Sequence, residues 1–212
     1  MEAFGGELIT AGRDFDESRI VAERVQRERG YHFVPSFHRE LVMGVATYAH
    51  ELFTSHPDLD VVYVPIGMGS GICGLITIRD LLGLKTDIVG VVAAKAPAFA
   101  LSFEAGRIVS TETARTFADG MACREPQAEP FDIIRKGAAR IVTVTEDDIA
   151  EAMRIFFTDT HNTAEGAGAA GLAALLNERD RYQERRAGVI LSGCNIDMPI
   201  FAQVLRGQTP AL

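Results

Sequence analysis

The centre of this sequence is the stretch Val61-Val62-Tyr63-Val64-Pro65-Ile66-Gly67-Met68-Gly69-Ser70-Gly71-Ile72-Cys73-Gly74. A mostly β-branched apolar run leads directly into glycines and a serine, and apolar residues at helical spacing follow. This order predicts a buried strand, a glycine loop and a helix. Backbone N–H groups at a helix start have no partner within the helix, and glycines leave room around them. The stretch therefore predicts a phosphate-binding site.

The composition is that of a globular protein, and the length suits one sizeable domain, or one and a fraction. The chain has 212 residues, of which 47% are hydrophobic and 24% are charged. Its net charge is −8 and it holds only three lysines, so no nucleic-acid partner is expected. No apolar run approaches the roughly 20 residues needed to cross a bilayer, and the N-terminus lacks the features of a signal peptide. No membrane partner is expected either.

The cysteines indicate the compartment. Cys73, Cys123 and Cys194 are widely spaced and odd in number. That count fits reduced thiols and argues against a disulfide framework, so a cytoplasmic location is predicted. No CxxC pair or histidine cluster suggests a zinc site.

Apolar strands alternate with helical patterns along the chain, which predicts an α/β fold with a mainly parallel, twisted sheet flanked by helices on both faces. The first strand–helix pair is expected to belong to a different lobe, with residues 31–37 as the crossing. Strands are predicted at 7–10, 31–34, 61–66, 87–94, 140–144 and 188–191, with 107–109 as a further candidate and 116–122 as a loop. Helices are predicted at about 17–29, 40–53, 71–82, 98–103, 129–136, 146–157, 165–179 and 199–206.

The glycine loop allows more than one interpretation. Residues 69–74 match GxGxxG after a strand, the pattern of dinucleotide-binding sites. That interpretation predicts an acidic residue about 20 positions on, at the end of the next strand. The next strand ends in Ala93-Ala94-Lys95, so the match is weakened, although a lysine can favour a ribose phosphate. The glycines can also serve only a tight turn between strand and helix.

Three further features are weaker candidates. A second GxGxxG, at residues 166–171, follows no strand and is best explained by close helix packing. Ser192 follows a predicted buried strand, where its hydroxyl can bond a heterocyclic nitrogen or simply form a Ser-Gly turn. Asp119 and Glu165 are loop carboxylates near strand ends, and either can be a helix cap or a solvated residue instead.

Together these pieces resemble a known family. The motifs are residues 65–71, 117–120, 164–169 and 191–195, supported by 12–17 and 33–37. With these motifs in register, the chain resembles the serine/threonine dehydratases, which are pyridoxal-phosphate enzymes of fold type II (tryptophan synthase β-like).

The resemblance implies a cofactor, pyridoxal 5'-phosphate, and a reaction. The family removes the α-proton and the β-hydroxyl of a small hydroxy amino acid and releases ammonia and a 2-oxo acid. Threonine, serine and a hydroxylated acidic relative stay open as substrates. By the same resemblance, Ser192 would bond the pyridine nitrogen and Gly120 and Glu165 would lie near the ring. The cofactor phosphate would be cradled by Gly67, Met68, Gly69, Ser70 and Gly71.

The departures from the family pattern matter as much. The family's cofactor lysine segment and its Ser-x-Gly-Asn loop have no counterpart here, and Lys85, Lys95 and Lys136 all have the sequence context of surface charges. The chain is therefore expected to be the C-terminal two-thirds of a dehydratase, with no catalytic residue assigned. Residues 1–34 would be a remnant of the small substrate-closing domain, and 35–212 the large cofactor-binding domain.

Four expectations complete the interpretation. The chain alone should bind the cofactor weakly at best and should not turn over. The alternative is a pseudoenzyme that serves as a binding or oligomerisation module. Residues 93–95 offer no carboxylate for the metal that some relatives hold, and no C-terminal regulatory domain is expected. Relatives are commonly dimers or tetramers, and a partial lobe exposes apolar surface, so a homo-oligomer, in particular a dimer, is predicted.

Overall fold

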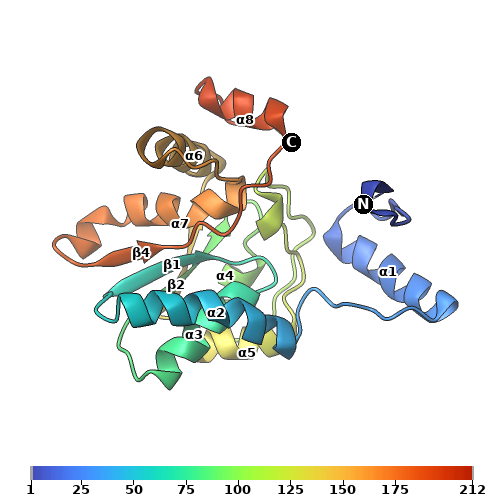
Figure 1. The fold of residues 1–212 in the computed structure, drawn as a ribbon, viewed down its shortest axis with the longest axis horizontal. Coiled ribbons are helices and arrows are strands. Elements are labelled where there is room, and N and C mark those ends of the chain that lie inside the picture. Colours follow the sequence, from blue (N-terminus) through green and yellow to red (C-terminus); the bar gives the residue numbers. More distant parts are fainter. Residues whose placement is uncertain (1, 212) are drawn as a thin grey trace. The chain divides into compact units, whose positions relative to one another are not determined.

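The computed structural model describes residues 2–211 and divides into two compact units, Met1–Ser36 and Phe37–Leu212 (Figure 1). The first unit contains η1 (Glu2–Phe4) and α1 (Phe15–Arg29). The strands of the second unit are β1 (Val61–Pro65), β2 (Asp87–Ala93), β3 (Arg140–Val144) and β4 (Ala187–Val189). Its helices are α2 (Arg39–Ser55), α3 (Ser70–Leu81), α4 (Ala98–Ala105), η2 (Asp119–Met121), α5 (Ala128–Gly137), α6 (Glu146–Thr160), α7 (Gly166–Asn177), η3 (Arg179–Tyr182) and α8 (Met198–Leu205).

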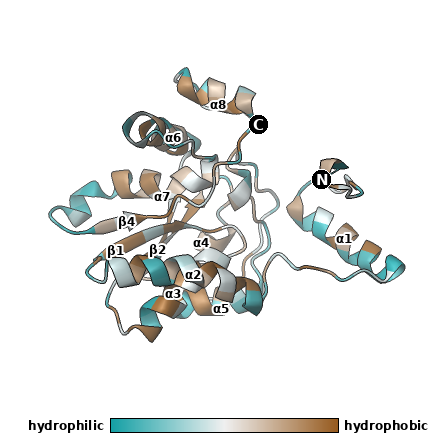
Figure 2. Ribbon diagram, in the orientation of Figure 1, coloured by the Kyte–Doolittle hydropathy of each residue, from teal (hydrophilic) through white to brown (hydrophobic). Residues whose placement is uncertain are grey.

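The second unit is built on a four-stranded sheet with the order β3-β2-β1-β4, and every pairing is parallel. Side chains alternate between the two faces along β1, as a pleated strand requires. Val61 and Tyr63 pack with α6 and α7, whereas Val62 and Val64 pack with α2, α3 and α5. Both faces are thus covered, which explains why β1 is apolar and why β2 is apolar after its first residue, Asp87 (Figure 2). The predicted fold class is confirmed.

The path of the chain creates a crevice at one end of the sheet. From β1 the chain passes through α3 to β2, and through α4 and α5 to β3, with these three helices packed on one face. It then crosses by α6 and α7 on the other face and returns to β4, which pairs with the free side of β1. The carboxyl ends of β1 and β4 therefore flank a topological switch point, where open α/β sheets bind their ligands.

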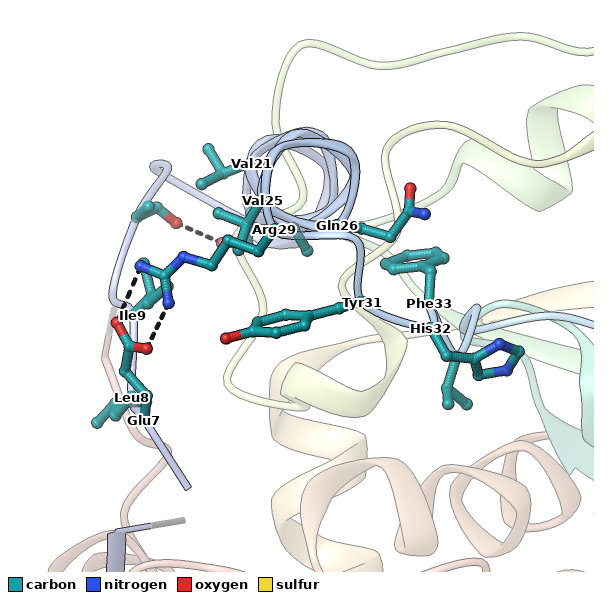
Figure 3. Close-up of a pocket in the computed structure, with 14 residues that line it drawn as sticks. Glu7, Leu8, Ile9, Val21, Val25, Gln26, Arg29, Tyr31, His32 and Phe33 are labelled. Carbon is teal, nitrogen blue, oxygen red and sulfur yellow. Dashed lines mark hydrogen bonds and ion pairs between the residues drawn. The ribbon is translucent and has the colours of Figure 1, made fainter. Parts of the chain in front are cut away.

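The first unit has little core of its own. Its helix α1 begins at the cap Asp14, whose side chain accepts a hydrogen bond from the Glu17 N–H, and ends at Gly30 in the left-handed region. Among residues 2–36, Asp16 alone is buried. Apolar side chains of α1 and of the segments on either side line an open pocket of about 470 Å³, where Arg29 pairs with Glu7 (Figure 3).

The sequence prediction was wrong about two strands and about one candidate strand. Residues 7–10 and 31–34 form no regular secondary structure and pair with no strand among residues 2–211, and the candidate at 107–109 belongs to a loop. A strand exists only with a hydrogen-bonded neighbour, and local composition does not supply one. The other predicted strands and helices are present, with ends that differ by at most three residues. No helix within residues 2–211 has the length and apolar character needed to cross a membrane.

Candidate functional site

The glycine loop occupies the carboxyl end of β1. Gly69 has a φ of +97° and stands at the N-cap position of α3, where no side chain caps the helix. The first N–H groups of α3 therefore have no intrahelical acceptor and no capping side chain. Gly67 approaches another loop so closely that an added Cβ would lie 2.2 Å from the carbonyl oxygen of Gly120. The loop consequently presents main-chain donors in a space that side chains would fill.

A pocket of about 670 Å³ opens at this loop and extends to the end of β4. Its walls come from α2, the end of β1, the glycine loop, η2, the start of α7 and the end of β4. All eight residues that the sequence assigned to the cofactor line it, namely Gly67, Met68, Gly69, Ser70, Gly71, Gly120, Glu165 and Ser192. The structure brings these residues together; that they bind a cofactor stays a prediction. Asp119 lines a neighbouring pocket of about 370 Å³.

Tyr48 is a pocket residue that sequence reasoning missed. It comes from α2, and its hydroxyl donates a hydrogen bond to the Gly71 carbonyl oxygen at 3.2 Å. Burial raises the pKa of Tyr48, so the phenol stays protonated and remains a donor. The available sequence signal was the spacing of three residues between Val45, another lining residue, and Tyr48. Such spacing indicates that the two side chains share one face of a helix, but it does not identify Gly71 as the partner.

The loop after β4 is tied to the start of α7. The Asn195 N–H donates to Oε2 of Glu165 at 2.9 Å, and the Glu165 N–H donates to the Gly193 carbonyl oxygen at 3.1 Å. Ser192 lies directly before these bonded residues and faces the pocket. Glu165 therefore touches the pocket and also connects two of its walls.

A buried carboxylate holds the loop that leads into η2, the short helix that contains Gly120. Glu146, the first residue of α6, accepts hydrogen bonds from the Thr116 hydroxyl and the Phe117 N–H, each at 3.2 Å. The Thr116 hydroxyl in turn accepts from the Ala118 N–H at 3.1 Å. Sequence reasoning assigned Glu146 only to the acidic helix start. Its burial and its partners thirty positions away carried no sequence signal.

No lysine, arginine or histidine is found among the described residues that line this pocket. Lys85, Lys95 and Lys136 are all exposed, as predicted, and Lys85 lines a different pocket beside Asp87 at the start of β2. Any anion at the glycine loop would be held by main-chain N–H groups and the dipole of α3. Residues 2–211 also contain no cluster of three His, Cys, Asp or Glu side chains suited to a metal.

A family model described as "Pyridoxal-phosphate dependent enzyme" matches residues 1–193. The chain belongs to this family. Over 98% of its length it is 38% identical to an L-threonine ammonia-lyase of Geobacter sulfurreducens, and over 95% it is 32% identical to one of Thermotoga maritima. These matches cover 52% and 50% of the two relatives, so the chain spans about half the length of the curated proteins it resembles.

Solved structures agree with this pyridoxal-phosphate family. The processed threonine deaminase isoform 2 of Solanum lycopersicum superimposes with a TM-score of 0.88 at 27% identity, covering 97% of this chain and 61% of that one. Maize serine racemase gives a TM-score of 0.83 at 27% identity, covering 97% and 65%. The resemblance to pyridoxal-phosphate dehydratases is confirmed, and the dinucleotide interpretation of the glycine loop is set aside.

The residues present fit the family's cofactor at its phosphate end. The uncapped start of α3 supplies N–H donors, and the contact between Gly67 and Gly120 leaves no room for side chains there. At the other end, Ser192 contributes a neutral hydroxyl to the same pocket. The lining holds no amine for a covalent link to the cofactor within the described residues.

Proposed function

We propose that this chain is the cofactor-binding part of a threonine ammonia-lyase-like enzyme. The observation that carries the proposal is the meeting of four separate sequence motifs in one pocket at the switch point between β1 and β4. Main-chain donors of residues 67–71 would hold the phosphate, Ser192 would bond the pyridine nitrogen, and Gly120 and Glu165 would lie near the ring. When bound, pyridoxal phosphate supplies an electron-accepting ring for the deamination of an amino acid.

The substrate is a small hydroxy amino acid that is converted to a 2-oxo acid and ammonia. Relatives of comparable identity are named L-threonine ammonia-lyase, L-threo-3-hydroxyaspartate ammonia-lyase and phenylserine dehydratase. These names share a β-hydroxy amino acid and differ in the group beyond the hydroxyl. The proposal therefore fixes the class of substrate, with threonine as the first member to test.

The remaining parts of the proposal concern the whole protein. Residues 1–34 form a remnant of a small domain that closes over substrate, and 35–212 form the large domain; the division of the structure after Ser36 supports this. The protein works in the cytoplasm, which its three cysteines without disulfides support. It assembles as a homodimer, and exposed apolar side chains such as Leu8, Ile20 and Val34 support self-association.

A second candidate is a non-catalytic module that retains the cofactor pocket. The observation that favours it is the pocket lining, which contains no lysine among the described residues. Such a module holds the cofactor by its phosphate and ring alone, without a covalent bond and without turnover. The two candidates share the phosphate site and differ in whether the complete protein, of which this chain is a part, deaminates threonine.

A titration with pyridoxal phosphate, followed by visible absorbance, tests the shared part. We expect saturable binding, and borohydride reduction with peptide mapping should find no cofactor on Lys85, Lys95 or Lys136. Gly67→Ala should weaken binding at least about tenfold, because its Cβ would meet Gly120. The matched control is Gly44→Ala, where an added Cβ meets nothing within 4 Å.

The outcomes separate the candidates. Absence of binding by the unmodified chain, or equal binding by the Gly67→Ala variant, would reject the phosphate site. A coupled assay for 2-oxo acid distinguishes the rest: turnover of threonine by the chain alone would contradict the expectation that it is inactive. Binding of pyridoxal phosphate without turnover of threonine would favour the non-catalytic module, provided that adding a separate subunit does not produce turnover either.

A further inference from the structure

We infer that Glu165 is a positioning residue that holds the segment Ser192–Asn195, here called the 192 loop, in place beside the cofactor pocket. The inference deepens the proposed function and rests on it. Its basis is a pair of hydrogen bonds on one residue. The Glu165 N–H donates to the Gly193 carbonyl oxygen at 3.1 Å, and the Glu165 carboxylate accepts from the Asn195 N–H at 2.9 Å.

The carboxylate is directed to the loop and away from its own helix. Glu165 is the N-cap residue of α7 and has the extended backbone typical of that position. Side chains at this position usually accept a hydrogen bond from the first turn of their helix. The side chain of Glu165 makes no such cap bond. Its carboxylate instead accepts a hydrogen bond from the main chain of the 192 loop, and so links two segments that are distant in sequence.

Close packing restricts the 192 loop at Gly193, whereas Ser192, Cys194 and Asn195 are exposed. An added Cβ at Gly193 would lie 2.5 Å from Oε1 of Glu165, and one at Gly168 would lie 2.4 Å from the Gly193 carbonyl oxygen. Gly193 is half-buried and packs closely against the side chain of Glu165 and the first turn of α7. Ser192 immediately precedes Gly193, so the clamp determines where the Ser192 hydroxyl is presented.

The position of Glu165 also explains why it lines two pockets. It forms part of the wall of the cofactor pocket and part of the wall of the neighbouring pocket that contains Asp119 and Asn195. The bond from Asn195 to Glu165 thus runs along the partition between them. Without it, the 192 loop is free to move toward either side, and Ser192 loses its fixed relation to the ring.

Two variants distinguish a clamp from a charge that acts on the ring directly. Glu165→Gln removes the charge but keeps an oxygen that accepts from the Asn195 N–H, whereas Glu165→Ala removes both. A clamp predicts that glutamine retains the function and alanine loses it. A direct effect of charge predicts that the two variants are equally defective.

Cys194 provides a readout that does not depend on activity. It lies within the 192 loop and is exposed, whereas Cys73 and Cys123 are buried. Burial raises the pKa of Cys73 to about 12, so its thiolate is scarce at neutral pH. The rate of alkylation of Cys194 by iodoacetamide, located by peptide mapping, therefore reports the order of the 192 loop.

The experiment measures three quantities on the full chain: the alkylation rate of Cys194, the affinity for pyridoxal phosphate and the affinity for inorganic phosphate. Glu165→Ala should change the alkylation rate of Cys194 several-fold and lower the affinity for pyridoxal phosphate roughly tenfold. The affinity for inorganic phosphate should be unchanged, because the glycine loop is intact. Glu165→Gln should stay within about twofold of the parent protein. Glu104→Ala, an exposed change on α4, is the matched control.

A double substitution completes the test. In a Ser192→Ala background, the further change Glu165→Ala should cause no additional loss of pyridoxal phosphate affinity, because Glu165 acts through Ser192. Equal defects in the Gln and Ala variants, or an unchanged alkylation rate in the Ala variant, would overturn the inference. Failure of the parent chain to bind pyridoxal phosphate would instead reject the proposed function, while the alkylation comparison would still test the clamp.

Discussion

At the scale of single residues, Tyr48 shows how a helix on one face of the sheet reaches the site. Its hydroxyl bonds the carbonyl oxygen of Gly71 in the first turn of α3, next to the glycine loop. That bond ties the loop to α2, and the contact between Gly67 and Gly120 ties it to η2. Tyr48 therefore acts on the phosphate end of the pocket through the main chain.

Tyr48→Phe should weaken binding of pyridoxal phosphate about three- to tenfold, because a hydrogen bond of this kind contributes on the order of 1 kcal/mol. Binding of pyridoxal, which lacks the phosphate, should be unchanged. Titrating both ligands by absorbance gives the comparison, and Thr47→Ala, an exposed neighbour, is the control. An equal loss for both ligands would show that Tyr48 acts on the ring or on stability in general.

Sequence reasoning predicted the site residues that belong to motifs and missed those that support them. The glycine loop, Gly120, Glu165 and Ser192 share one pocket, as the motifs predicted. Tyr48 and Glu146 lie outside every motif. A helix face can be inferred from spacing, but a hydrogen bond across 23 or 29 positions depends on how the elements dock. That Glu165 lies near the ring stays a prediction; its hydrogen bonds to the 192 loop carried no sequence signal.

At the scale of secondary structure elements, α6 supports the loop that carries Gly120. Glu146 is only 7% exposed, and its carboxylate accepts from a hydroxyl and an N–H of residues 116 and 117. Thr145 separately closes the same helix end with a capping box. Thr145 therefore stabilises the start of α6, and Glu146, the next residue, holds a distant loop.

Glu146→Ala should lower the free energy of unfolding by about 1–3 kcal/mol, since it leaves the buried donors of Thr116 and Phe117 without their acceptor. Glu146→Gln, which retains an acceptor oxygen, should cost less. Urea denaturation measures both. The exposed control Glu151→Ala should change stability by at most about 0.5 kcal/mol, since surface ion pairs contribute little. A similar cost for alanine and glutamine would indicate that the charge, and not the hydrogen bonds, matters.

The elements also show where local patterns stop being informative. Strands β1 and β2 were predicted well because burial on both faces makes residues 61–65 and 88–93 apolar. Residues 7–10 and 31–34 also contain β-branched or aromatic residues, yet neither segment pairs with a strand in the described chain. The difference lies in the neighbour that completes a ladder, which no window of sequence contains.

At the scale of the whole molecule, a polar cluster joins strands β3 and β1 to the residues that follow α7. Arg140 on β3 bonds Glu178 and the hydroxyl of Tyr182, and the hydroxyl of Tyr63 on β1 donates to Glu178 at 2.5 Å. Tyr63 is fully buried, so these groups are satisfied by one another. The cluster ties the end of α7 to the sheet at the end away from the glycine loop.

This cluster predicts a pH dependence of stability. Burial of Glu178 opposes its ionisation, but hydrogen bonds from Arg140 and Tyr63 outweigh burial and lower its pKa. A carboxylate with a lowered folded-state pKa stabilises the fold fully above its ordinary value of 4.5, and the contribution disappears as the pH falls through the folded pKa. Stability should therefore decline on acidification below about pH 5.

Glu178→Gln should remove part of that decline. Urea denaturation at a series of pH values between about 3 and 6 measures it, and the variant should show a flatter profile than the parent chain. Glu51→Gln, on an exposed position of α2, should leave the profile unchanged. If the Glu178 variant retained the full acid slope, the loss of stability would originate in other carboxylates.

The pairing of β1 with β4 has a consequence for the order in which the protein can assemble. Val61 lies opposite Ala187, and the two are separated by 126 positions (187 − 61). One wall of the pocket is therefore synthesised near the beginning of the second unit and the other near its end. A nascent chain that already contains the glycine loop lacks the pocket wall formed by residues 189–192 until β4 and Ser192 emerge. Long-range pairings of this kind form slowly, so ligand binding reports completion of the fold.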